Sequence, residues 1–327
     1  MNSIQILNAE GQDYSDHAYS ILSSLGKVTQ CHGLNRQSLL ADISQYNVLI
    51  VRLGNYIDKE IIDAAVNLKV IVTATTGLNH IDVSYANKKK VDILSLRGEY
   101  DFLRNISATA EHTIALLLSL LRNIPTAASS IKNNIWDRNL YKGREIDGKT
   151  FGILGYGRIG TKVAKYAKAF GANVVAYDLK NINGKQEEIA VASSLDQLFE
   201  NSDILSVHVP YNDTTHHLIN KSNINKMSEA SVLINTSRGE IINEMDLLNS
   251  LKECSISGAA LDVLTNEHLL SPKYPNPLIE YAKQRENLII TPHIGGATYE
   301  SMHKTEIFMA NKLSQWLKSS LNRDLQK

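Results

Sequence analysis

Short runs of apolar and β-branched residues alternate with stretches of helical periodicity along the whole chain. The first series of runs covers residues 4–7, 48–53, 70–75 and 92–96. The second series covers residues 151–154, 174–177, 204–209, 232–236, 258–263 and 288–291. Each run has the length of a strand, and roughly one helix separates it from the next. The alternation predicts parallel sheets with helices on both faces, because parallel strands need crossover connections.

The two series predict an α/β protein with two doubly wound domains, and the length of 327 residues gives the same number at about 150 residues per domain. Between the series lies a predicted helix over residues 107–123. Ser107 is its candidate N-cap and Glu111 lies in its first turn. Residues 114–121 are apolar on nearly every side, so the helix is either a core helix or one that also lies in a subunit interface.

The last segment, residues 299–321, predicts an amphipathic helix that packs on a neighbouring element. Its apolar stripe consists of Met302, Met309, Leu313, Trp316 and Leu317. No internal repeat and no low-complexity tract interrupts the pattern.

Charge and composition then exclude several classes of protein. Lys and Arg total 34, as do Asp and Glu, so no net charge favours nucleic acid or an anionic membrane as a partner. Apolar residues make up 43% and charged residues 21%, which is far from the profile of a disordered chain. We therefore expect an ordinary globular protein.

The cysteines and the N-terminus predict the compartment. Cys31 and Cys254 are the only cysteines, which excludes a disulfide framework and favours a reducing compartment without a metal site. Residues 1–12 lack a basic start and an apolar core. The run 114–121 is far shorter than the ~20 residues that span a bilayer. We expect a cytoplasmic protein with no membrane contact.

A glycine-rich turn follows the first strand of the second series. Gly155, Gly157 and Gly160 have the spacing G-x-G-x-x-G, a helical stripe follows, Gly171 is a plausible helix stop, and the next strand ends at Asp178. Such glycines permit the tight turn, the close approach of a pyrophosphate and close packing of helix on sheet. The helix N-terminus attracts the anion. The order of these elements predicts a dinucleotide site.

Asp178 lies 18 residues after Gly160, where an acidic side chain accepts hydrogen bonds from both hydroxyls of the adenosine ribose. Its carboxylate would repel a 2′-phosphate. The sequence therefore favours NAD over NADP, although Lys180 is close enough in sequence to soften that preference.

Three further segments, residues 235–239, 261–267 and 291–296, follow later strands of the second series. Their loops are expected at the carboxyl edge of the sheet, where ligands bind in doubly wound folds. They offer a cation, a carboxylate and an imidazole. A carbonyl reductase needs a guanidinium to hold a carboxylate, a proton donor, and an acid that orients the donor.

These segments, the glycine turn and the sequence SATAEH at 107–112 resemble the D-isomer-specific 2-hydroxyacid dehydrogenase family. The most specific motifs are GILGYGRIG at 152–160, HVP at 208–210, NTSRG at 235–239, GAALDV at 258–263 and TPHIGG at 291–296. The family includes D-3-phosphoglycerate, glycerate/hydroxypyruvate, D-lactate and formate dehydrogenases. All five motifs stand in the family's order and spacing.

The resemblance implies a Rossmann NAD-binding domain inserted in a flavodoxin-like substrate domain. The boundaries expected are 1–103 plus 298–327 for the substrate (catalytic) domain and 104–297 for the NAD-binding domain. The final helix would then return to the first domain, and the two crossings would form a hinge. No segment after Leu321 is expected to form the small regulatory domain that many phosphoglycerate dehydrogenases append.

The family's catalytic roles fall on three residues. The resemblance implies that Arg238 binds the substrate carboxylate and carbonyl, that His293 is the acid/base, and that Glu267 pairs with His293. The residues themselves also allow other roles. Arg238 could form a surface salt bridge, His293 could be a structural histidine, and Glu267 could be a solvated carboxylate. The family usually places proline after this glutamate, whereas here His268 follows, in a long loop, 264–286, with Pro272, Pro275 and Pro277.

The glycine turn and the resemblance together give the cofactor site. Asp262 is implied to approach the nicotinamide end, and residues 208–210 to border the dinucleotide. The complete set is Gly155, Gly157, Arg158, Ile159, Gly160, Asp178, His208, Val209, Pro210, Thr215, Thr236, Ser237, Asp262, Gly295 and Gly296. We expect His112, His216 and His217 to be structural or solvent-facing.

Two loops of the first domain match the family's substrate side, at residues 51–54 and 75–82. Backbone N–H groups of Thr76, Gly77 and Leu78 are suited to a carboxylate, as exposed amides at glycine turns are. Arg52 either adds charge for a phosphorylated or dicarboxylate substrate or forms an ion pair at the domain edge.

We therefore expect an NAD-dependent enzyme that interconverts a D-2-hydroxy acid and a 2-oxo acid by hydride transfer. The substrate would be 3-phosphoglycerate, glycerate/hydroxypyruvate or lactate-like. A small-molecule acid would be its partner, and the enzyme would form a homodimer through the 107–123 helix region. The alternative is an NAD-responsive regulatory protein similar to the corepressors of this family. Formate oxidation is disfavoured because no extra polar motif suits so small a substrate.

Overall fold

The computed structural model describes residues 4–10, 13–31, 35–180, 182, 189–271 and 274–324. The chain divides into two units. The first consists of Met1–Asn105 and Ala297–Lys327, and the second of Ile106–Gly296. Both chain crossings lie within two residues of the boundaries expected from the sequence.

The first unit has a five-stranded parallel sheet of order β2-β1-β3-β4-β5, which is the flavodoxin-like order. Its strands are β1 (Gln5–Asn8), β2 (Lys27–Gln30), β3 (Val48–Ile50), β4 (Val70–Val72) and β5 (Asp92–Leu94). Its first helices are α1 (Asp16–Leu25), α2 (Arg36–Asp42), α3 (Lys59–Ala64), α4 (Val83–Lys88) and α5 (Tyr100–Leu103), with the 3₁₀ helix η1 (Ile43–Gln45). The edge strand β2 was not predicted from the apolar pattern.

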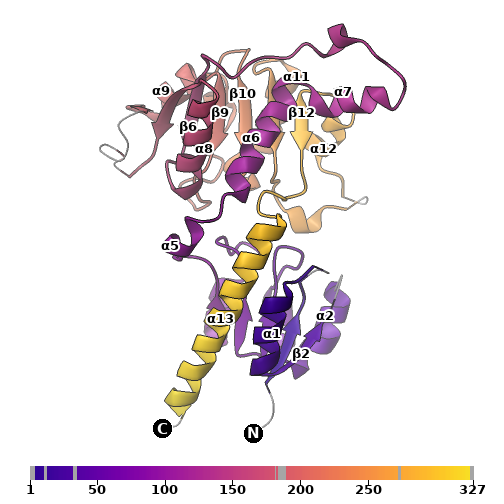
Figure 1. Ribbon diagram of the computed structural model, residues 1–327, viewed down its shortest axis with the longest axis vertical. Helices are drawn as coiled ribbons and strands as arrows, with labels where there is room; N and C mark the ends of the chain where they lie inside the picture. Colours follow the sequence, from indigo (N-terminus) through magenta and orange to yellow (C-terminus); the bar gives the residue numbers. More distant parts are fainter. Residues whose placement is uncertain are drawn as a thin grey trace. The chain divides into compact units, whose positions relative to one another are not determined.

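The long C-terminal helix α13 (Tyr299–Asp324) completes the first unit, where it lies alongside α1 (Figure 1). Met309 and Leu313 of its predicted stripe are fully buried. Lys312 Nζ donates to the Ser95 carbonyl at 2.8 Å. Trp316 Nε1 donates to Asp92 Oδ2 at 2.7 Å, next to the edge of the sheet. The helix therefore supplies both apolar cover and polar ties to the first unit.

The second unit has a seven-stranded parallel sheet of order β12-β11-β10-β9-β6-β7-β8. The strands are β6 (Thr150–Leu154), β7 (Asn173–Tyr177), β8 (Ala190–Val191), β9 (Ile204–Val207), β10 (Val232–Asn235), β11 (Gly258–Leu261) and β12 (Leu288–Ile290). The chain order reverses between β6 and β9, the switch point at which doubly wound sheets bind ligands. The two predicted doubly wound sheets are confirmed, and the short strand β8 is added.

Helices cover both faces of this sheet (Figure 1). Side chains of α6 and α8 pack on one face and those of α9, α10, α11 and α12 on the other. The helices are α6 (Ala108–Leu121), α7 (Ile124–Ile131), α8 (Arg158–Ala169), α9 (Leu195–Asn201), α10 (Lys221–Ile224), α11 (Glu244–Lys252) and α12 (Pro277–Ala282). The 3₁₀ helices are η2 (Arg138–Tyr141), η3 (Gly239–Ile241) and η4 (Glu267–Leu269).

Helix α6 is a core helix of its own unit. Its apolar side chains, including Leu117, are buried against the sheet and α8. Ser107 stands at the N-cap position, but its side chain does not cap the helix; it accepts a hydrogen bond from Lys162 Nζ at 2.9 Å. Among the described residues no single helix is long and apolar enough to cross a membrane. One bent pair, Tyr100–Leu121 with Ile124–Ile131, passes that test by length and composition only.

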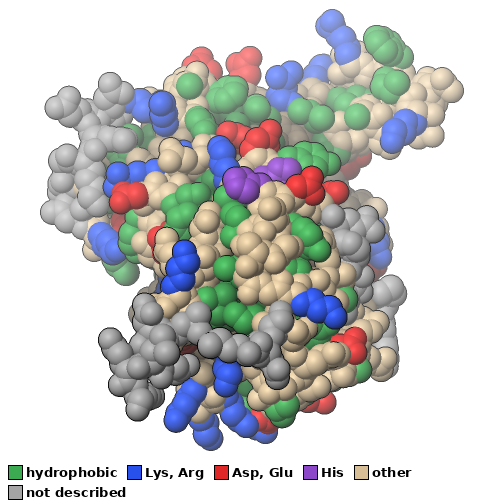
Figure 2. Space-filling view, turned by 60° about the horizontal axis from the view of Figure 1, so that its bottom comes forward, with side chains coloured by type: hydrophobic (Ala, Val, Ile, Leu, Met, Phe, Trp, Pro, Cys, Tyr) green, Lys and Arg blue, Asp and Glu red, His purple; other side chains and the backbone are tan. Residues whose placement is uncertain are grey.

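Charged side chains of both signs are interspersed over the face shown in Figure 2. This distribution agrees with the equal totals of basic and acidic residues in the sequence.

We predict that Leu313→Ala lowers the free energy of unfolding of the first unit by about 2–5 kcal/mol, because it leaves a cavity beneath α13, where this side chain is fully buried. A urea titration followed by tryptophan fluorescence measures this. Trp316 reports the first unit, whereas Trp136 is 90% exposed and changes little on unfolding. The exposed control Lys318→Ala should shift the value by no more than about 0.5 kcal/mol. Equal losses in both variants would contradict the packing assigned to Leu313.

Candidate functional site

The carboxyl ends of five strands bring the predicted segments of the second unit to one edge of its sheet. The glycine turn follows β6, residues 208–210 follow β9, and the Arg238 segment follows β10. The segments with Asp262 and His293 follow β11 and β12. Because all seven strands are parallel, these loops share one edge.

In the glycine turn, other backbone atoms lie close to two of the three glycines, and the third faces open space. Gly155 has φ +96°, and a Cβ there would lie 2.7 Å from the backbone N of Val209. A Cβ at Gly160 would lie 2.1 Å from the Gly155 carbonyl oxygen. At Gly157, in contrast, a Cβ would meet no protein atom within 4 Å. The turn is therefore tight against the protein and open at the position where a pyrophosphate is expected.

The start of helix α8 is free to bind an anion. Gly157 is its N-cap residue, and no side chain accepts a hydrogen bond from the first-turn N–H groups. Arg158 and Ile159, the first two helical residues, are half-buried. Uncapped N–H groups and the helix dipole favour a phosphate here.

Asp178 lies directly after β7 and contacts the glycine turn. Its Oδ2 accepts from the backbone N–H of Tyr156 at 2.9 Å, and its Oδ1 accepts from that of Lys180 at 2.8 Å. Each carboxylate oxygen has a further lone pair, and the side chain is half-buried. The carboxylate is thus fixed beside the turn with acceptor capacity left.

The loops after β9 and β10 are tied to each other. Ser237 Oγ donates to the Val209 carbonyl at 2.5 Å. His208 Nε2 is 2.8 Å from Ser206 Oγ, and burial lowers the pKa of His208 to about 3, so the ring is neutral near pH 7. Thr215, which is buried, donates to the Pro210 carbonyl at 2.8 Å and so shapes the loop.

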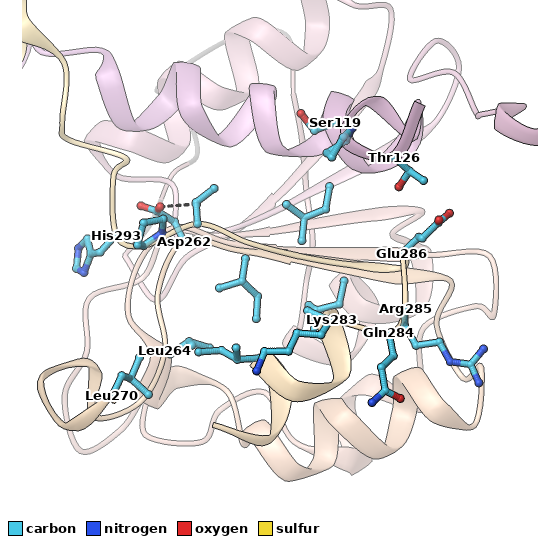
Figure 3. Close-up of a pocket in the computed structure, with 18 of the residues that line it drawn as sticks. Ser119, Thr126, Asp262, Leu264, Leu270, Lys283, Gln284, Arg285, Glu286 and His293 are labelled. Atoms are coloured by element: carbon cyan, nitrogen blue, oxygen red, sulfur yellow. Dashed lines mark hydrogen bonds between the residues drawn. The ribbon is translucent and has the colours of Figure 1, made fainter. Parts of the chain in front are cut away.

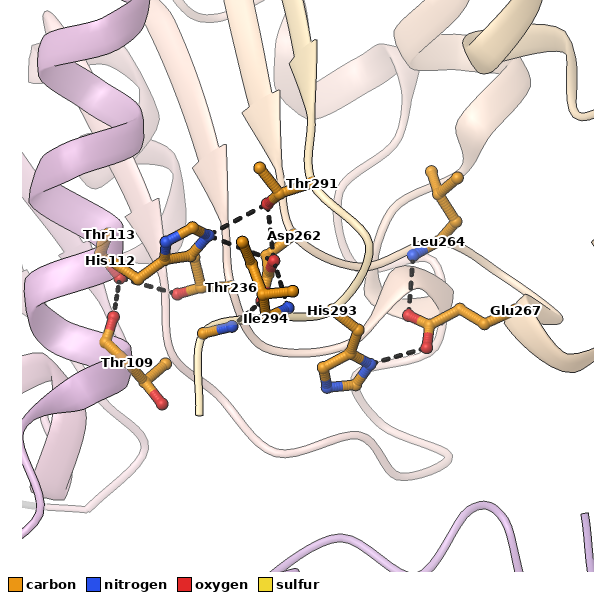
Figure 4. A network of polar contacts seen from close by, with 11 residues as sticks. Thr109, His112, Thr113, Thr236, Asp262, Leu264, Glu267, Thr291, His293 and Ile294 are labelled. Atoms are coloured by element: carbon orange, nitrogen blue, oxygen red, sulfur yellow. Dashed lines mark hydrogen bonds and ion pairs between the residues drawn. The ribbon is translucent and has the colours of Figure 1, made fainter. Parts of the chain in front are cut away.

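Asp262 is the centre of a polar network shown in Figure 4. It is buried at the end of β11 and 2% exposed. Its Oδ1 accepts from Thr291 Oγ1 at 2.6 Å and from the Ile294 N–H at 2.9 Å, and it lies 3.2 Å from His112 Nε2. Its Oδ2 accepts from the Gly295 N–H at 2.7 Å. This carboxylate therefore holds the loop that carries His293.

Burial alone would raise the pKa of Asp262. Hydrogen bonds from His112, Thr291 and the backbone of Ile294 and Gly295 outweigh that effect and lower the pKa below its ordinary value. The group is an anion near neutral pH. With so little exposed surface, its observed contacts are to the loop that it positions and to His112.

His293 and Glu267 form the predicted pair. His293 Nδ1 lies 2.6 Å from Glu267 Oε2, and both side chains are partly exposed. The other oxygen, Glu267 Oε1, accepts from the Leu264 N–H at 3.0 Å. The backbone of His293 is left-handed, with φ +54°. The pair leaves Nε2 of the imidazole as the nitrogen for proton exchange.

Arg238 precedes η3 and stands in an extended backbone conformation. Burial lowers the pKa of its guanidinium, and the charges of Glu267 and Glu240 oppose that effect. The neighbouring Gly239 packs closely against the loop of Glu267, since a Cβ at Gly239 would lie 2.1 Å from the Leu264 carbonyl carbon. The structure thus brings Arg238 and the Glu267–His293 pair together.

The loop around Glu267, in which His268 stands in place of the family's usual proline, is held by contacts to α11. Glu267 opens η4, preceded by Asn266 in the left-handed region at φ +55°. Glu244 fixes the loop from α11: its Oε1 accepts from the Thr265 N–H at 2.6 Å and its Oε2 from Asn276 Nδ2 at 2.8 Å. Pro277 begins α12, and Pro272 lies outside the described residues.

The network extends to α6, where His112 has the structural role that is one of the two expected for it, and where Thr109 and Thr113 were not expected from the sequence. His112 Nε2 also lies 3.0 Å from Thr291 Oγ1. Thr113 Oγ1 donates to the Thr109 carbonyl and lies 2.8 Å from Thr236 Oγ1, which is buried (Figure 4). The spacing of Thr109, His112 and Thr113 on one face of a helix is the signal that predicts such a cluster.

In the first unit, the loop after β4 has free amides. The backbone N–H groups of Thr76, Gly77 and Leu78 have no hydrogen-bond acceptor within the described part of the chain. Thr75 Oγ1 donates to the Gly77 carbonyl at 2.7 Å and fixes the turn. Three neighbouring N–H groups are suited to a carboxylate.

Arg52 forms ion pairs, which is the second of the two roles that the sequence left open for it. Its Nε lies 2.9 Å from Glu10 Oε2, and its Nη2 lies 3.3 Å from Glu306 Oε1. Thr305 Oγ1 accepts a further hydrogen bond at 3.2 Å. Two carboxylates therefore face the one guanidinium, and its charge is neutralised within the first unit.

A groove of about 790 Å³ runs beside the edge strand β12, between α6, α7 and α12 (Figure 3). Asp262 and His293 stand at one of its ends. Among the described residues that line it are Asp262, Glu267 and His293 but not the glycine turn or Asp178, so the groove meets the expected dinucleotide site only at its Asp262 end. Nowhere in the described chain do three or more His, Cys, Asp or Glu side chains have an arrangement that suits a metal ion.

Comparison with known proteins assigns most of the second unit. Residues 114–295 match the family described as "D-isomer specific 2-hydroxyacid dehydrogenase, NAD binding domain". That match spans the glycine turn, Arg238, Glu267 and His293.

Individual relatives agree with it. D-3-phosphoglycerate dehydrogenase of Methanocaldococcus jannaschii is 34% identical over 94% of this chain, which spans only 56% of that relative. Hydroxypyruvate reductase of Thermotoga maritima is 34% identical over 88% of this chain and 90% of its own length. The crystal structure of D-lactate dehydrogenase from Aquifex aeolicus, complexed with NAD and lactic acid, is 27% identical, covers 97% of this chain and 96% of its own, and has a TM-score of 0.83.

We predict that Asp262→Asn destabilises the second unit by about 2–3 kcal/mol at pH 7, because the amide cannot accept all four hydrogen bonds. The pKa of Asp262 is depressed below 3.8 in the folded state, so its contribution is complete above about pH 4 and is lost as the pH falls through the folded pKa. Denaturant unfolding at pH 7 and pH 3 measures the difference between wild type and variant. A pH-independent difference would contradict the assignment, and the exposed control Asp213→Asn should show none.

Proposed function

Because the chain belongs to the D-isomer specific 2-hydroxyacid dehydrogenase family, we propose that it is an NAD-dependent oxidoreductase interconverting a D-2-hydroxy acid and a 2-oxo acid. The observation that carries the proposal is the 2.6 Å contact between His293 Nδ1 and Glu267 Oε2, beside Arg238 and on the same sheet edge as the glycine turn. The chain spans about half of the phosphoglycerate dehydrogenases that it matches, so its own activity is a matter for assay.

The cofactor site fits a dinucleotide. The uncapped start of α8 and the open space at Gly157 suit the pyrophosphate, and Asp178 has acceptor capacity for the ribose hydroxyls. The same carboxylate repels a 2′-phosphate, which supports NAD over NADP. When bound, the nicotinamide supplies or accepts the hydride at the substrate carbon.

His293 exchanges the proton. A carboxylate accepts hydrogen bonds, so Glu267 fixes the hydrogen on Nδ1 and turns Nε2 toward proton exchange. In the reductive direction, Nε2–H of the imidazolium donates its proton to the carbonyl oxygen of the 2-oxo acid. In the oxidative direction, the neutral Nε2 takes the proton from the hydroxyl group.

Two groups suit the substrate carboxylate. The guanidinium of Arg238 offers two parallel N–H donors and polarises the adjacent carbonyl. Within the first unit, the N–H groups of Thr76, Gly77 and Leu78, which have no acceptor among the described residues, suit a carboxylate as well. Among 3-phosphoglycerate, glycerate/hydroxypyruvate and lactate-like substrates, the neutralised Arg52 favours those without a phosphate.

We propose that the protein is a cytoplasmic homodimer. The predicted interface helix α6 is buried within its own unit, whereas the segment that follows it exposes large apolar residues. These are Ile124, Ile131, Ile135, Trp136 and Leu140. Ile124 is adjacent in the chain to Asn123 and Pro125, which line the apolar groove beside β12. Such patches favour an isologous contact between two copies. The two free cysteines support a reducing compartment.

We predict that His293→Asn lowers kcat with NADH and glyoxylate by about 10²–10⁴-fold, because the general acid is lost. Asn is preferred to Ala because it tolerates the left-handed backbone at this position. A fluorescence titration should show unchanged NADH affinity. Near-wild-type turnover of the variant would contradict the role of His293, and the exposed control His17→Asn should keep full activity.

We predict that Trp136→Glu converts the dimer to a monomer, because it places a charge in a desolvated interface. Sedimentation velocity of wild type and variant measures the mass. Val66→Glu is the matched control, since Val66 is also exposed and apolar but lies in the first unit. A monomeric wild type, or a dimeric Trp136→Glu variant, would exclude this interface.

A further inference from the structure

The first unit contains a cavity of about 360 Å³ with an acidic and aromatic wall. Its acidic residues are Glu10, Asp13 and Glu306, and its rings are those of Tyr14, Tyr299 and His303. All of these residues belong to the first unit. No residue assigned above to hydride transfer, proton exchange or the dinucleotide lines it among the described residues.

Two of the acids are buried and share one cation. The side chain of Glu10 is 3% exposed and that of Glu306 is 1% exposed. Arg52 contacts both, so the three side chains carry a net negative charge when both carboxyls are ionised. Glu306 Oε2 is further satisfied by the Ser15 N–H at 2.8 Å. The uncompensated charge is therefore on the side of Glu10.

One carboxyl oxygen of Glu10 has no hydrogen-bond partner among the described residues. Its Oε2 faces Arg52, but its Oε1 is buried and has no hydrogen-bond partner within the described part of the chain. Buried carboxylate oxygens are almost always paired, because leaving one unpaired costs the desolvation energy of the group. Glu10 also lines the cavity, so a carboxyl group with an unpartnered buried oxygen stands in the cavity wall.

The electrostatics of Glu10 agree with a missing positive charge. Burial raises the pKa of Glu10 to about 7, Arg52 opposes the rise and Glu306 adds to it. A cation beside the carboxylate would restore its ordinary acidity.

We propose that this cavity binds a small organic cation, an ammonium or guanidinium group, held beside the Glu10 carboxyl group. Asp13 at the exposed side adds a second negative charge, and the rings of Tyr14 and Tyr299 offer faces for a cation–π contact. The volume accommodates such a group with a short carbon chain and is at the small end for ligand pockets. A free anion is excluded by the three acids.

The cation has two possible sources. It is either the far end of the 2-oxo acid substrate or a separate amine. The first source rests on the proposed function, whereas the second does not.

The first arm of the test measures kcat/KM with NADH for 5-guanidino-2-oxopentanoate, the neutral 2-oxohexanoate and the anionic 2-oxoglutarate. A substrate cation predicts at least a tenfold preference for the guanidino acid. The second arm titrates the whole protein calorimetrically with butylguanidinium and with its uncharged isostere butylurea. A separate amine predicts that only butylguanidinium binds.

Variants of the cavity residues test whether the substrate preference or the butylguanidinium binding arises in this cavity. Glu10→Gln and Asp13→Lys should each reduce the preference, or the affinity, about tenfold or more. Asp13 is exposed, so Asp13→Lys decides the outcome if Glu10→Gln does not fold. Glu300→Gln removes an exposed charge from the same helix as Glu306 outside the cavity and should change neither value.

The proposal is overturned if neither arm distinguishes the cation from its neutral isostere, or if the distinction survives Asp13→Lys. Failure of the proposed function has a different signature. In that case no 2-oxo acid, glyoxylate included, is reduced, and butylguanidinium binding alone decides whether the cavity is a cation site.

Discussion

The buried carboxylate of Asp262 is the interaction on which the candidate site depends. It binds the loop 291–295 through one hydroxyl and two backbone N–H groups, and it reaches back to His112 on α6. A charge held in this way resists displacement, because an unpaired carboxylate at this depth would cost several kcal/mol. The position of His293 is thus set by a group that itself exchanges no proton with substrate.

The parallel sheet adds a second constraint. Its strands end at one edge, so the glycine turn, Asp178, Arg238 and His293 gather there although more than one hundred residues separate the first from the last. The groups at this edge that suit anions are N–H donors and a guanidinium, balanced by carboxylates in the loops. A chain with no net charge can therefore still present local sites for a carboxylate and a pyrophosphate.

Most of the fold and of the site followed from patterns that are local in sequence. The alternation of buried strands with helices was enough to predict both sheets, whereas the His293–Glu267 pair was implied by the family resemblance that the ordered motifs carry. Strand β2, with the sequence KVTQ, is half-exposed at a sheet edge and has no apolar run, and β8 has only two residues. Ser107 occupies the predicted N-cap position, but its hydroxyl accepts a hydrogen bond from Lys162, a residue distant in sequence. Local sequence rules cannot predict such a tertiary contact. The partners of Arg52 lie about forty and two hundred and fifty positions away, so no spacing rule could choose between its two readings.

The two crossings of the chain also govern the order of folding during synthesis. The second unit is one continuous segment and has all of its strands once residue 296 has left the ribosome. The first unit is synthesised earlier but lacks α13, and with it Glu306, Met309 and Leu313, until the end of the chain emerges. Until then, Arg52 lacks its second ion-pair partner, Glu306. The unit made first is completed second, and its apolar α1 face is the surface that a chaperone would meet on the nascent chain.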